Sequence, residues 1–283
     1  MAVGTCGNTP IHLAAREGHQ NVVRILMSNM ENPNFPRKSD GATPILMAAQ
    51  NGHQEVVKML MTRISEENSN ILSNDGATPI LMASQNGHLE IVKQLITGTE
   101  NNPNVVPPGG PKNSIGNPNI PTSIGVTPIL TAAKNGHLEI VKLLITHTNN
   151  PNAPSNNGVT PILAASLKGH FEIVKVLMGH TDNPNASENT GVTPIFAASQ
   201  NGHLEIVKLL INSTDNPNEP NNNGATPILM AAKKGHIEIV KLLMNTTNNP
   251  NAPDNFGRTP EAIAIRKNHH EIAALLRGKR HKA

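Results

Sequence analysis

The sequence is poor in aromatic residues: of its 283 residues, four are Phe and none is Tyr or Trp. So few rings cannot dominate a large compact core. Burial must therefore come in small increments from Leu, Ile, Val, Met and Ala, which favours a modular structure. The same shortage removes the stacking platforms with which proteins hold single strands and RNA. Because the formal charge is only +3 and most of the bases are dispersed, we expect no nucleic-acid partner.

Cysteine and long apolar runs are also scarce. The single Cys6 excludes an internal disulfide framework and a four-cysteine zinc site, and it fits a reducing compartment. No apolar run approaches the ~18 residues of a membrane span, and "MAVGTCGNTP" lacks the regions of a signal peptide. We expect no membrane insertion and a cytoplasmic location, with the nucleus as the alternative because residues 278–283 form a basic tail.

What the sequence does have is a repeat. The dipeptide Thr-Pro occurs eight times, with successive spacings of 34, 35, 49, 33, 33, 33 and 33 residues, at Thr9, Thr43, Thr78, Thr127, Thr160, Thr193, Thr226 and Thr259. A Gly-His pair follows it in seven copies, and the eighth copy has Asn268-His269 instead. Such a period predicts an array of units that bury their apolar faces against their neighbours.

The unit that begins at Gly158 predicts a pair of helices. Thr160 is a natural helix N-cap, and Pro161 suits the first helical position, where a missing N–H costs nothing. Gly169 ends this helix where a left-handed conformation is needed. The following "FEIVKVLM" places its apolar residues on one face at helical spacing, with a Glu and a Lys on the other.

An Asn-rich stretch such as "HTNNPNAPSNNG" (147–158) joins one helix pair to the next. Pro fixes φ, Asn side chains cap turns, and Asn-Gly is a strong signal for a tight turn. We therefore expect an extended turn. Its Asn-Pro-Asn is nearly invariant among the copies and should set the turn, whereas the positions before the Gly vary.

The pattern Gly-x-Thr-Pro-Ile-Leu-x-Ala-Ala-x-x-Gly-His-Leu-Glu-Ile-Val-Lys-Leu-Leu resembles the ankyrin repeat over essentially the whole chain. The eight copies start near residues 7, 41, 76, 125, 158, 191, 224 and 257. The resemblance implies a single domain (1–283) that is an all-α repeat solenoid, in which helical hairpins joined by β-hairpin-like fingers form a concave face. Because Pro in Asn-Pro-Asn removes a backbone donor, we expect a shorter or differently paired finger hairpin.

Two departures from the family pattern carry further expectations. The family's His after Thr-Pro-Leu survives only as His12, so we expect apolar packing between repeats at the equivalent positions, which are Leu46, Leu81, Leu130, Leu163, Phe196 and Leu229. The 49-residue spacing contains an insert at 102–116 with three Gly and four Pro. It cannot be a helix, so we expect a protruding loop.

Recurrence also separates scaffold from function. An active site normally occurs once, whereas a residue that recurs in seven copies belongs to the scaffold, so we interpret the Gly-His histidines and the Glu/Lys pairs as structural. No Walker or Rossmann glycine-rich loop is present. We therefore expect no enzymatic activity, no catalytic residues, no metal site and no cofactor.

The resemblance implies a binding surface on the concave face. In ankyrin domains the residues before the finger Gly, the residue before Thr-Pro and the two residues closing the first helix form it. Carried onto this sequence, the candidates are Ile124, Val126, Lys134, Asn156, Asn157, Leu167, Lys168, Gln200, Lys233, Lys234, Phe256, Arg258 and Lys267. The early repeats are neutral or slightly acidic at these slots (Asp40, Asp75, Gln50), whereas the later ones carry bases.

We interpret the chain as a monomeric protein-binding scaffold or adaptor. Its fourth to eighth repeats would bind an extended or helical protein segment of acidic character, with Leu167 and Phe256 as apolar anchors. Each candidate taken alone is also explained as solvated surface. Two alternatives stay open: an interaction domain of a larger enzyme or signalling protein, and a substrate of an asparaginyl hydroxylase. The second rests on Leu eight residues before Asn185 and Asn218, although a Pro precedes each Asn.

Overall fold

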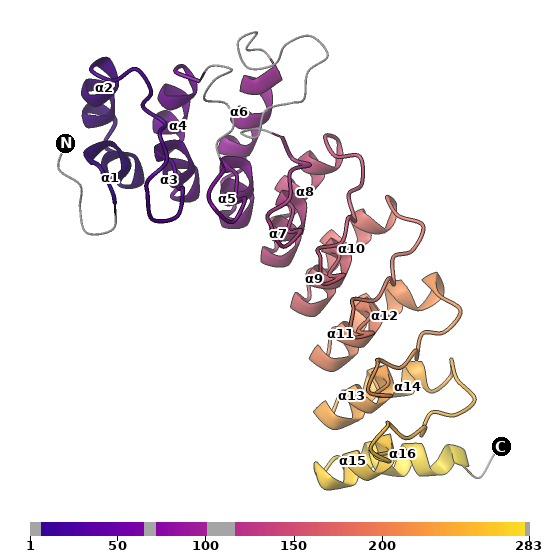
Figure 1. Cartoon of the computed structure of the whole chain (residues 1–283). Helices are drawn as coiled ribbons and strands as arrows, with labels where there is room; N and C mark the ends of the chain where they lie inside the picture. Colours follow the sequence, from indigo (N-terminus) through magenta and orange to yellow (C-terminus); the bar gives the residue numbers. More distant parts are fainter. Residues whose placement is uncertain (1–6, 65–71, 101–116, 281–283) are drawn as a thin grey trace. The chain divides into compact units, whose positions relative to one another are not determined.

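The computed structural model describes residues 7–64, 72–100 and 117–280 (Figure 1). Cys6 and the insert predicted at 102–116 lie outside these ranges. Within them the regular structure is helical and no strand occurs, so the predicted all-α repeat array is confirmed. The described helices are also all too short or too polar to cross a lipid bilayer.

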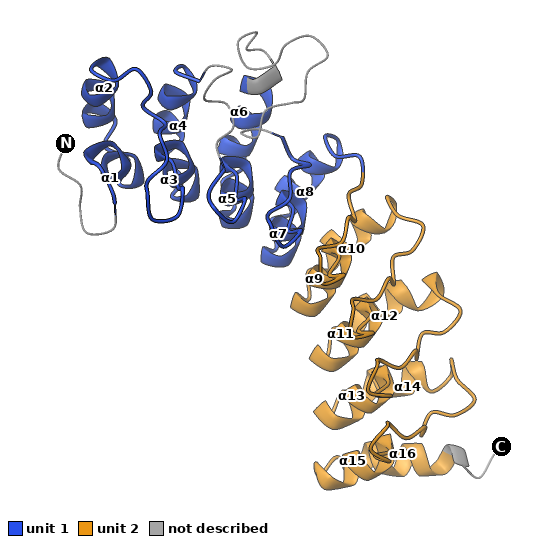
Figure 2. Cartoon of the chain, in the orientation of Figure 1, with its two compact units in different colours: residues 1–149 blue, residues 150–283 orange. Residues whose placement is uncertain are grey.

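The chain divides into two compact units, residues 1–149 (unit 1) and 150–283 (unit 2), coloured separately in Figure 2. The single repeat domain predicted from the sequence stays a prediction: a repeat contacts only its neighbours, so an array has no central core and compact units can be distinguished within it. Unit 1 contains α1 (Pro10–Arg16), α2 (Gln20–Ser28), α3 (Pro44–Gln50), α4 (Gln54–Met61), α5 (Pro79–Asn86), α6 (Leu89–Glu100), α7 (Pro128–Asn135) and α8 (Leu138–Ile145).

Unit 2 repeats the same arrangement four times. It contains α9 (Pro161–Lys168), α10 (Phe171–Met178), α11 (Pro194–Asn201), α12 (Leu204–Leu210), the short 3₁₀ helix η2 (Ile211–Ser213), α13 (Pro227–Lys234), α14 (Ile237–Leu243), α15 (Pro260–Arg266) and α16 (His270–Arg280). Because α16 continues through Arg280, the predicted basic tail at 278–283 begins inside a helix, and residues 281–283 lie outside the described ranges.

The first helix of each repeat begins and ends as its sequence dictates. In α9 the Thr160 hydroxyl accepts the N–H of Leu163 at 3.1 Å, and Pro161 occupies the first helical position. Gly169 ends the helix with φ +84°, a left-handed conformation that costs a residue with a Cβ about 1–2 kcal/mol. The predicted caps of this helix are therefore confirmed.

The core of each unit lies between consecutive helix pairs. First helices pack on first helices (α1, α3, α5 and α7 in unit 1; α9, α11, α13 and α15 in unit 2), and second helices contact one another in the same order within each unit. Leu46 clusters with Leu81 in unit 1, and Phe196 clusters with Leu229 in unit 2. The expected apolar packing at the position of the family's His is confirmed there, and it brings neighbouring repeats into direct contact.

The Gly-His histidines also join neighbouring repeats. Nε2 of His53 lies 2.8 Å from the carbonyl oxygen of Arg16, to which it donates, and the ring packs against the preceding Gly18, where an added Cβ would lie 2.5 Å from Nδ1. The same contact recurs from His88, His137 and His236 to the carbonyls of Gln50, Gln85 and Gln200. These histidines are structural, as the recurrence indicated.

The fingers are turns rather than two-stranded hairpins. In the fifth repeat, Ser155 N–H donates to Val159 O, Gly158 N–H donates to Ser155 O at 2.8 Å, and the neighbouring Asn189 N–H donates to Asn157 O at 3.0 Å. This finger, which the structure describes throughout, contains no strand, so its pairing is shorter than that of a two-stranded hairpin, as the sequence indicated.

Candidate functional site

In unit 2 the second Asn of each Asn-Pro-Asn motif caps the helix that follows its finger. Oδ1 of Asn152 accepts the N–H of Ile162 at 3.1 Å. The same bond recurs ten residues apart at Asn185–Ile195, Asn218–Ile228 and Asn251–Glu261. In the first turn of α9, Pro161 has no N–H and the Thr160 hydroxyl accepts the N–H of Leu163, so the N–H of Ile162 still needs an acceptor. The motif therefore fixes each finger to its helix, a role that the sequence analysis missed when it assigned the motif to the turn alone.

A second Asn position links consecutive fingers of unit 2. The side-chain amide of Asn189 donates to the carbonyl of Asn156 at 3.3 Å, and the same bond recurs from Asn222 to Asn189 and from Asn255 to Asn222 at 3.0 and 3.1 Å. The slot of Asn156 thus joins neighbouring fingers. The following slot holds the exposed Asn157, Asn223 and Phe256. The finger slots predicted to contact a partner therefore divide into a linking position and an outward position.

The last turns of the first helices in unit 2 carry most of the predicted bases. Lys168 and Lys234 are exposed, Lys233 and Gln200 are half-buried, and Leu167 keeps 42% of its surface exposed. Among the described residues, neither Lys168, Lys233 nor Lys234 pairs with an acid. A cation is favoured at a helix C-terminus in any case. The positive charge at these helix ends is therefore not neutralised within the described part of the protein.

The second helices of the repeats in unit 2, which we call the outer helices, differ in how their Lys side chains are paired. Lys208 lies 2.7 Å from Glu205, and Lys241 lies 2.8 Å from Glu238, each pair on one helix face. Charge on α12 and α14 is thus balanced locally, whereas the Lys residues at the first-helix ends have no such partner among the described residues. We give one name, the basic face of unit 2, to the exposed and half-buried residues at the outward finger slots and at the ends of the first helices. Its members are Asn157, Leu167, Lys168, Gln200, Asn223, Lys233, Lys234, Phe256, Arg258, Arg266 and Lys267.

Arg266 belongs to this set although the sequence analysis omitted it. α15 ends at Arg266, Lys267 caps it, and Asn268 takes the left-handed place of the usual Gly with φ 63°. Arg266 is therefore the counterpart of Lys233, and Lys267 is the counterpart of Lys234. The Asn268-His269 pair, in place of Gly-His, was the signal in the sequence that fixes this register.

The finger of the eighth repeat holds an aromatic side chain in a fixed environment. Phe256 is 69% exposed, and the Arg258 guanidinium lies 4.7 Å from its ring centroid. Arg258 is itself held by the buried Asp254, whose Oδ2 accepts from Nε at 2.6 Å. Burial acts to raise the pKa of Asp254, but hydrogen bonds from the Arg258 side chain and from the backbone lower it below its usual value. Phe256 is thus an exposed ring whose neighbours are already ordered.

The candidates of the fourth repeat lie in unit 1. Ile124 keeps 62% of its surface exposed at a finger tip, Val126 is half-buried, and Lys134 is exposed at the end of α7. They occupy the same slots as the basic face, but in the other compact unit.

Unit 1 contains a hollow that the sequence analysis did not identify. It lies between the fingers that end at Gly41 and Gly76, with a volume of ≈ 430 Å³, and we call it the finger pocket. Its lining includes the side chains of Asp40, Asp75, Gln50, Met47 and Met82. One feature of the sequence is related to it: two successive repeats place an Asp in the finger and a Met in the first helix.

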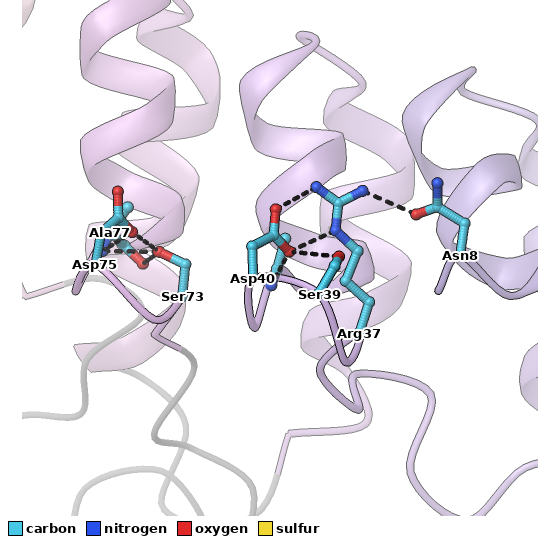
Figure 3. A network of polar contacts seen from close by, with 8 residues as sticks. Asn8, Arg37, Ser39, Asp40, Ser73, Asp75 and Ala77 are labelled. Atoms are coloured by element: carbon cyan, nitrogen blue, oxygen red, sulfur yellow. Dashed lines mark hydrogen bonds and ion pairs between the residues drawn. The ribbon is translucent and has the colours of Figure 1, made fainter. Parts of the chain in front are cut away.

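Two polar networks form the rim of the finger pocket (Figure 3). On one finger the Arg37 guanidinium holds both carboxylate oxygens of Asp40 and also donates to Asn8 Oδ1 at 2.9 Å. On the other, Asp75 Oδ1 accepts from the Ser73 hydroxyl and from Ala77 N–H. Asp40 is thereby paired with a cation, and within the described ranges Asp75 is not.

The asparagines considered for hydroxylation are buried. Asn185 and Asn218 expose only 5% and 6% of their surface, and Oδ1 of each accepts the helix N–H described above. Their side chains are therefore engaged in the folded protein, so a modifying enzyme would have to open the finger first.

Comparison with protein families gives one result that covers the whole chain. The family model described as ankyrin repeats (3 copies) matches residues 2–70, 31–106, 62–155, 105–188, 129–219, 178–254 and 195–283. Comparison with curated proteins finds no match.

Proposed function

The chain belongs to the ankyrin repeat family, and on that premise we propose that the basic face of unit 2 binds a protein segment of acidic character. Ankyrin repeats are generally protein–protein interaction modules. The observation that carries the proposal is the separation of charge within unit 2. Lys208 of α12 and Lys241 of α14 pair with Glu, whereas the Lys residues at its first-helix ends have no acidic partner among the described residues.

An acidic segment would supply the missing partner charges. Complementary charge speeds encounter and fixes orientation more than it adds affinity, so binding also requires apolar contacts. Leu167 and Phe256 supply exposed apolar surface at two places on the basic face. Because Arg258 and the buried Asp254 already order the surroundings of Phe256, less entropy is lost when a partner covers the ring.

Two charge-matched variants, each with three substitutions, test the proposal. One variant carries Lys168→Ala, Lys233→Ala and Lys234→Ala on the basic face, and the control carries Lys175→Ala, Lys208→Ala and Lys241→Ala on the outer helices. Arg258 stays in both, because its loss would leave the carboxylate of Asp254 buried without a cationic partner. The probe is a labelled peptide of Glu with interspersed Leu, and fluorescence anisotropy measures its Kd at two salt concentrations.

We expect the basic-face variant to bind about tenfold or more weakly, and the control to bind within about threefold of the unchanged protein. Affinity should also fall as salt rises. Equal losses in the two variants would mean that net charge alone attracts the peptide, and the proposal would fail. Thermal denaturation of both variants separates lost binding from lost folding.

The role as a scaffold or adaptor is the wider form of the same proposal, and it applies equally if the chain is one domain of a larger enzyme or signalling protein. Hydroxylation is the weaker second candidate, because Asn185 and Asn218 are buried and hydrogen-bonded. Intact-mass analysis after exposure to an asparaginyl hydroxylase tests it, since modification adds the mass of one oxygen atom.

A further inference from the structure

The finger pocket of unit 1 has an apolar floor. Leu46, Met47 and Leu81 belong to one buried cluster, and the partly buried Met82 packs against it. Met47 and Met82 line the pocket itself. Thioether side chains are flexible and polarisable, so a methionine floor adapts to apolar groups of different shape. The volume of ≈ 430 Å³ also lies within the range of about 300–1,000 Å³ that is usual for ligand sites.

The rim of the pocket carries one carboxylate that has no cationic partner among the described residues. Arg37 neutralises Asp40, and the hydrogen bond from Arg37 is the main reason that the pKa of Asp40 falls to about 2. Asp75 has no such partner among the residues that the structure describes. Its Oδ1 is already bonded to Ser73 and to Ala77 N–H, so Oδ2 is the oxygen left to accept a new donor.

The walls are held in place before any partner binds. Asn74 N–H donates to Asp40 O at 2.8 Å, which links the two fingers. The Asn74 side chain lies against Gly41, where an added Cβ would come within 2.5 Å of its Oδ1. On the other side, Arg37 joins its finger to Asn8 of the first repeat. A pocket with fixed walls loses little entropy when it is filled.

We propose that the finger pocket binds an extended peptide segment in which an apolar side chain lies next to a lysine. The apolar side chain would cover Met47 and Met82, and the ammonium would donate to Asp75 Oδ2. Lysine fits better than arginine, because one free carboxylate oxygen suits a point charge and not a two-pronged donor. Gln50, exposed at the end of α3, offers both an amide donor and an acceptor to the peptide backbone. This specificity is opposite in charge to that of the basic face and rests on different residues.

The repeats themselves supply variants that the scaffold tolerates. Asn occupies the slot of Asp75 in the fifth and seventh repeats (Asn157 and Asn223), so Asp75→Asn removes the charge and keeps an oxygen acceptor. Thr occupies the slot of Met82 in the fourth repeat (Thr131), so Met82→Thr removes the methionine surface. Glu139→Gln is the matched control in the same unit, because Glu139 is exposed on the outer helix α8 and pairs with Lys142.

The test is selection of a random peptide library on the full chain, followed by Kd measurement of the enriched peptides on each variant. We expect enrichment of an apolar residue next to Lys. Binding should weaken about tenfold in Asp75→Asn and by a similar factor in Met82→Thr, with Glu139→Gln unchanged. Replacing the peptide's Lys by Glu should abolish binding to unchanged protein.

Three results would overturn the inference: no enrichment of the apolar–lysine pair above background, equal binding to Asp75→Asn, or equal binding to Met82→Thr. The variant with Lys168→Ala, Lys233→Ala and Lys234→Ala separates this inference from the proposed function. It should bind the selected peptides normally. Weaker binding would place the peptides on unit 2 and defeat the finger pocket while leaving the basic face open to its own test.

Discussion

The two units share their helices and differ in their fingers. In unit 2 the Thr-Pro spacing is a constant 33 residues, and every Asn-Pro-Asn caps a helix ten residues on. In unit 1 the spacings are 34, 35 and 49 residues, and the same motif behaves differently. Asn34 lies eleven residues before Ile45, donates to Leu60 O at 3.1 Å, and has an Oδ1 with no partner in the structure.

The difference shows what a single inserted residue does. One extra residue moves the second Asn out of reach of its helix. The correct count is not sufficient, however: Asn119 keeps the ten-residue distance to Ile129, yet its side chain bonds to His147 O and to Thr148. In unit 2 the constant period accompanies regularly repeated Asn caps and Asn links. In unit 1 the fingers instead form local networks, and two of them line the finger pocket.

The largest expected effect tests whether the helix pairs are equivalent in the two units. Gly18 in unit 1 and Gly169 in unit 2 both have a left-handed backbone conformation. In Gly18→Ala and Gly169→Ala the added Cβ would lie only 2.5 and 2.6 Å, respectively, from the nearest atom of a His ring. We expect each to lower the free energy of unfolding by about 2–3 kcal/mol. Gly257→Ala, which has a φ of +73° and nothing near its Cβ, should cost about 1 kcal/mol. Urea denaturation measures all three, and a clear difference between the first two would break the equivalence.

The next effect tests the fingers. Asn185→Ala leaves the Ile195 N–H buried without an acceptor and should cost about 2 kcal/mol. Asn34→Ala loses one bond but also removes an unpaired oxygen, so its cost should be under about 1 kcal/mol. Hydrogen exchange at Ile195 should accelerate only in the first variant. Similar costs would contradict the contrast between the units.

A smaller, stabilising effect is expected inside the first helices. The buried hydroxyls of Ser84, Ser166 and Ser199 have no partner in the structure, whereas Ala fills the same slot in other repeats, as at Ala133. Replacing each Ser by Ala should raise the free energy of unfolding by about 0.5–1 kcal/mol. The gain should be the same in Ser84→Ala of unit 1 as in the two unit 2 variants. Loss of stability on urea denaturation would show that the hydroxyl does bond.

The smallest effect is the pH dependence that His12 gives to unit 1. Burial lowers the pKa of His12 below its ordinary value of 6.5, and the ring lies edge-on to Phe35. The unfolded chain therefore binds the proton first, so stability falls as pH drops below 6.5 and levels off below the folded pKa. His12→Leu, which places in the first repeat the residue found at Leu46, should remove this slope. Hydrogen exchange of α1 followed against pH measures it, and an unchanged slope would assign the effect to other groups.

Asp40 gives unit 1 a second slope at lower pH. Its pKa is about 2 when folded and 3.8 unfolded, so its contribution is present above 3.8 and is lost as pH falls through 2. Because the Asp40 side chain is half exposed, we expect only a minor loss in the free energy of unfolding. Asp40→Asn serves as its control in the same titration.

Local signals determined most of the fold. Thr-Pro, Gly-His and the apolar spacing decide where helices begin, end and bury a face, and these signals act within a few residues of chain. That is why the helix pairs, the role of the Gly-His histidines and the apolar packing at Leu46 and Phe196 were predictable. The exposure of Leu167 and Phe256 was also predictable, because repeats provide an internal alignment of surface slots.

The tertiary structure decided what depends on distance between segments. The Asn185 cap and the links between Asn189 and Asn222 each require two parts of the chain to meet in space. The finger pocket likewise requires residues of two successive repeats to come together over Met47 and Met82. The sequence by itself determined the repeated unit, since its signals are short-range. The stacking of the repeats decides which polar groups pair inside the scaffold and which stay exposed, because those pairs join residues of different segments.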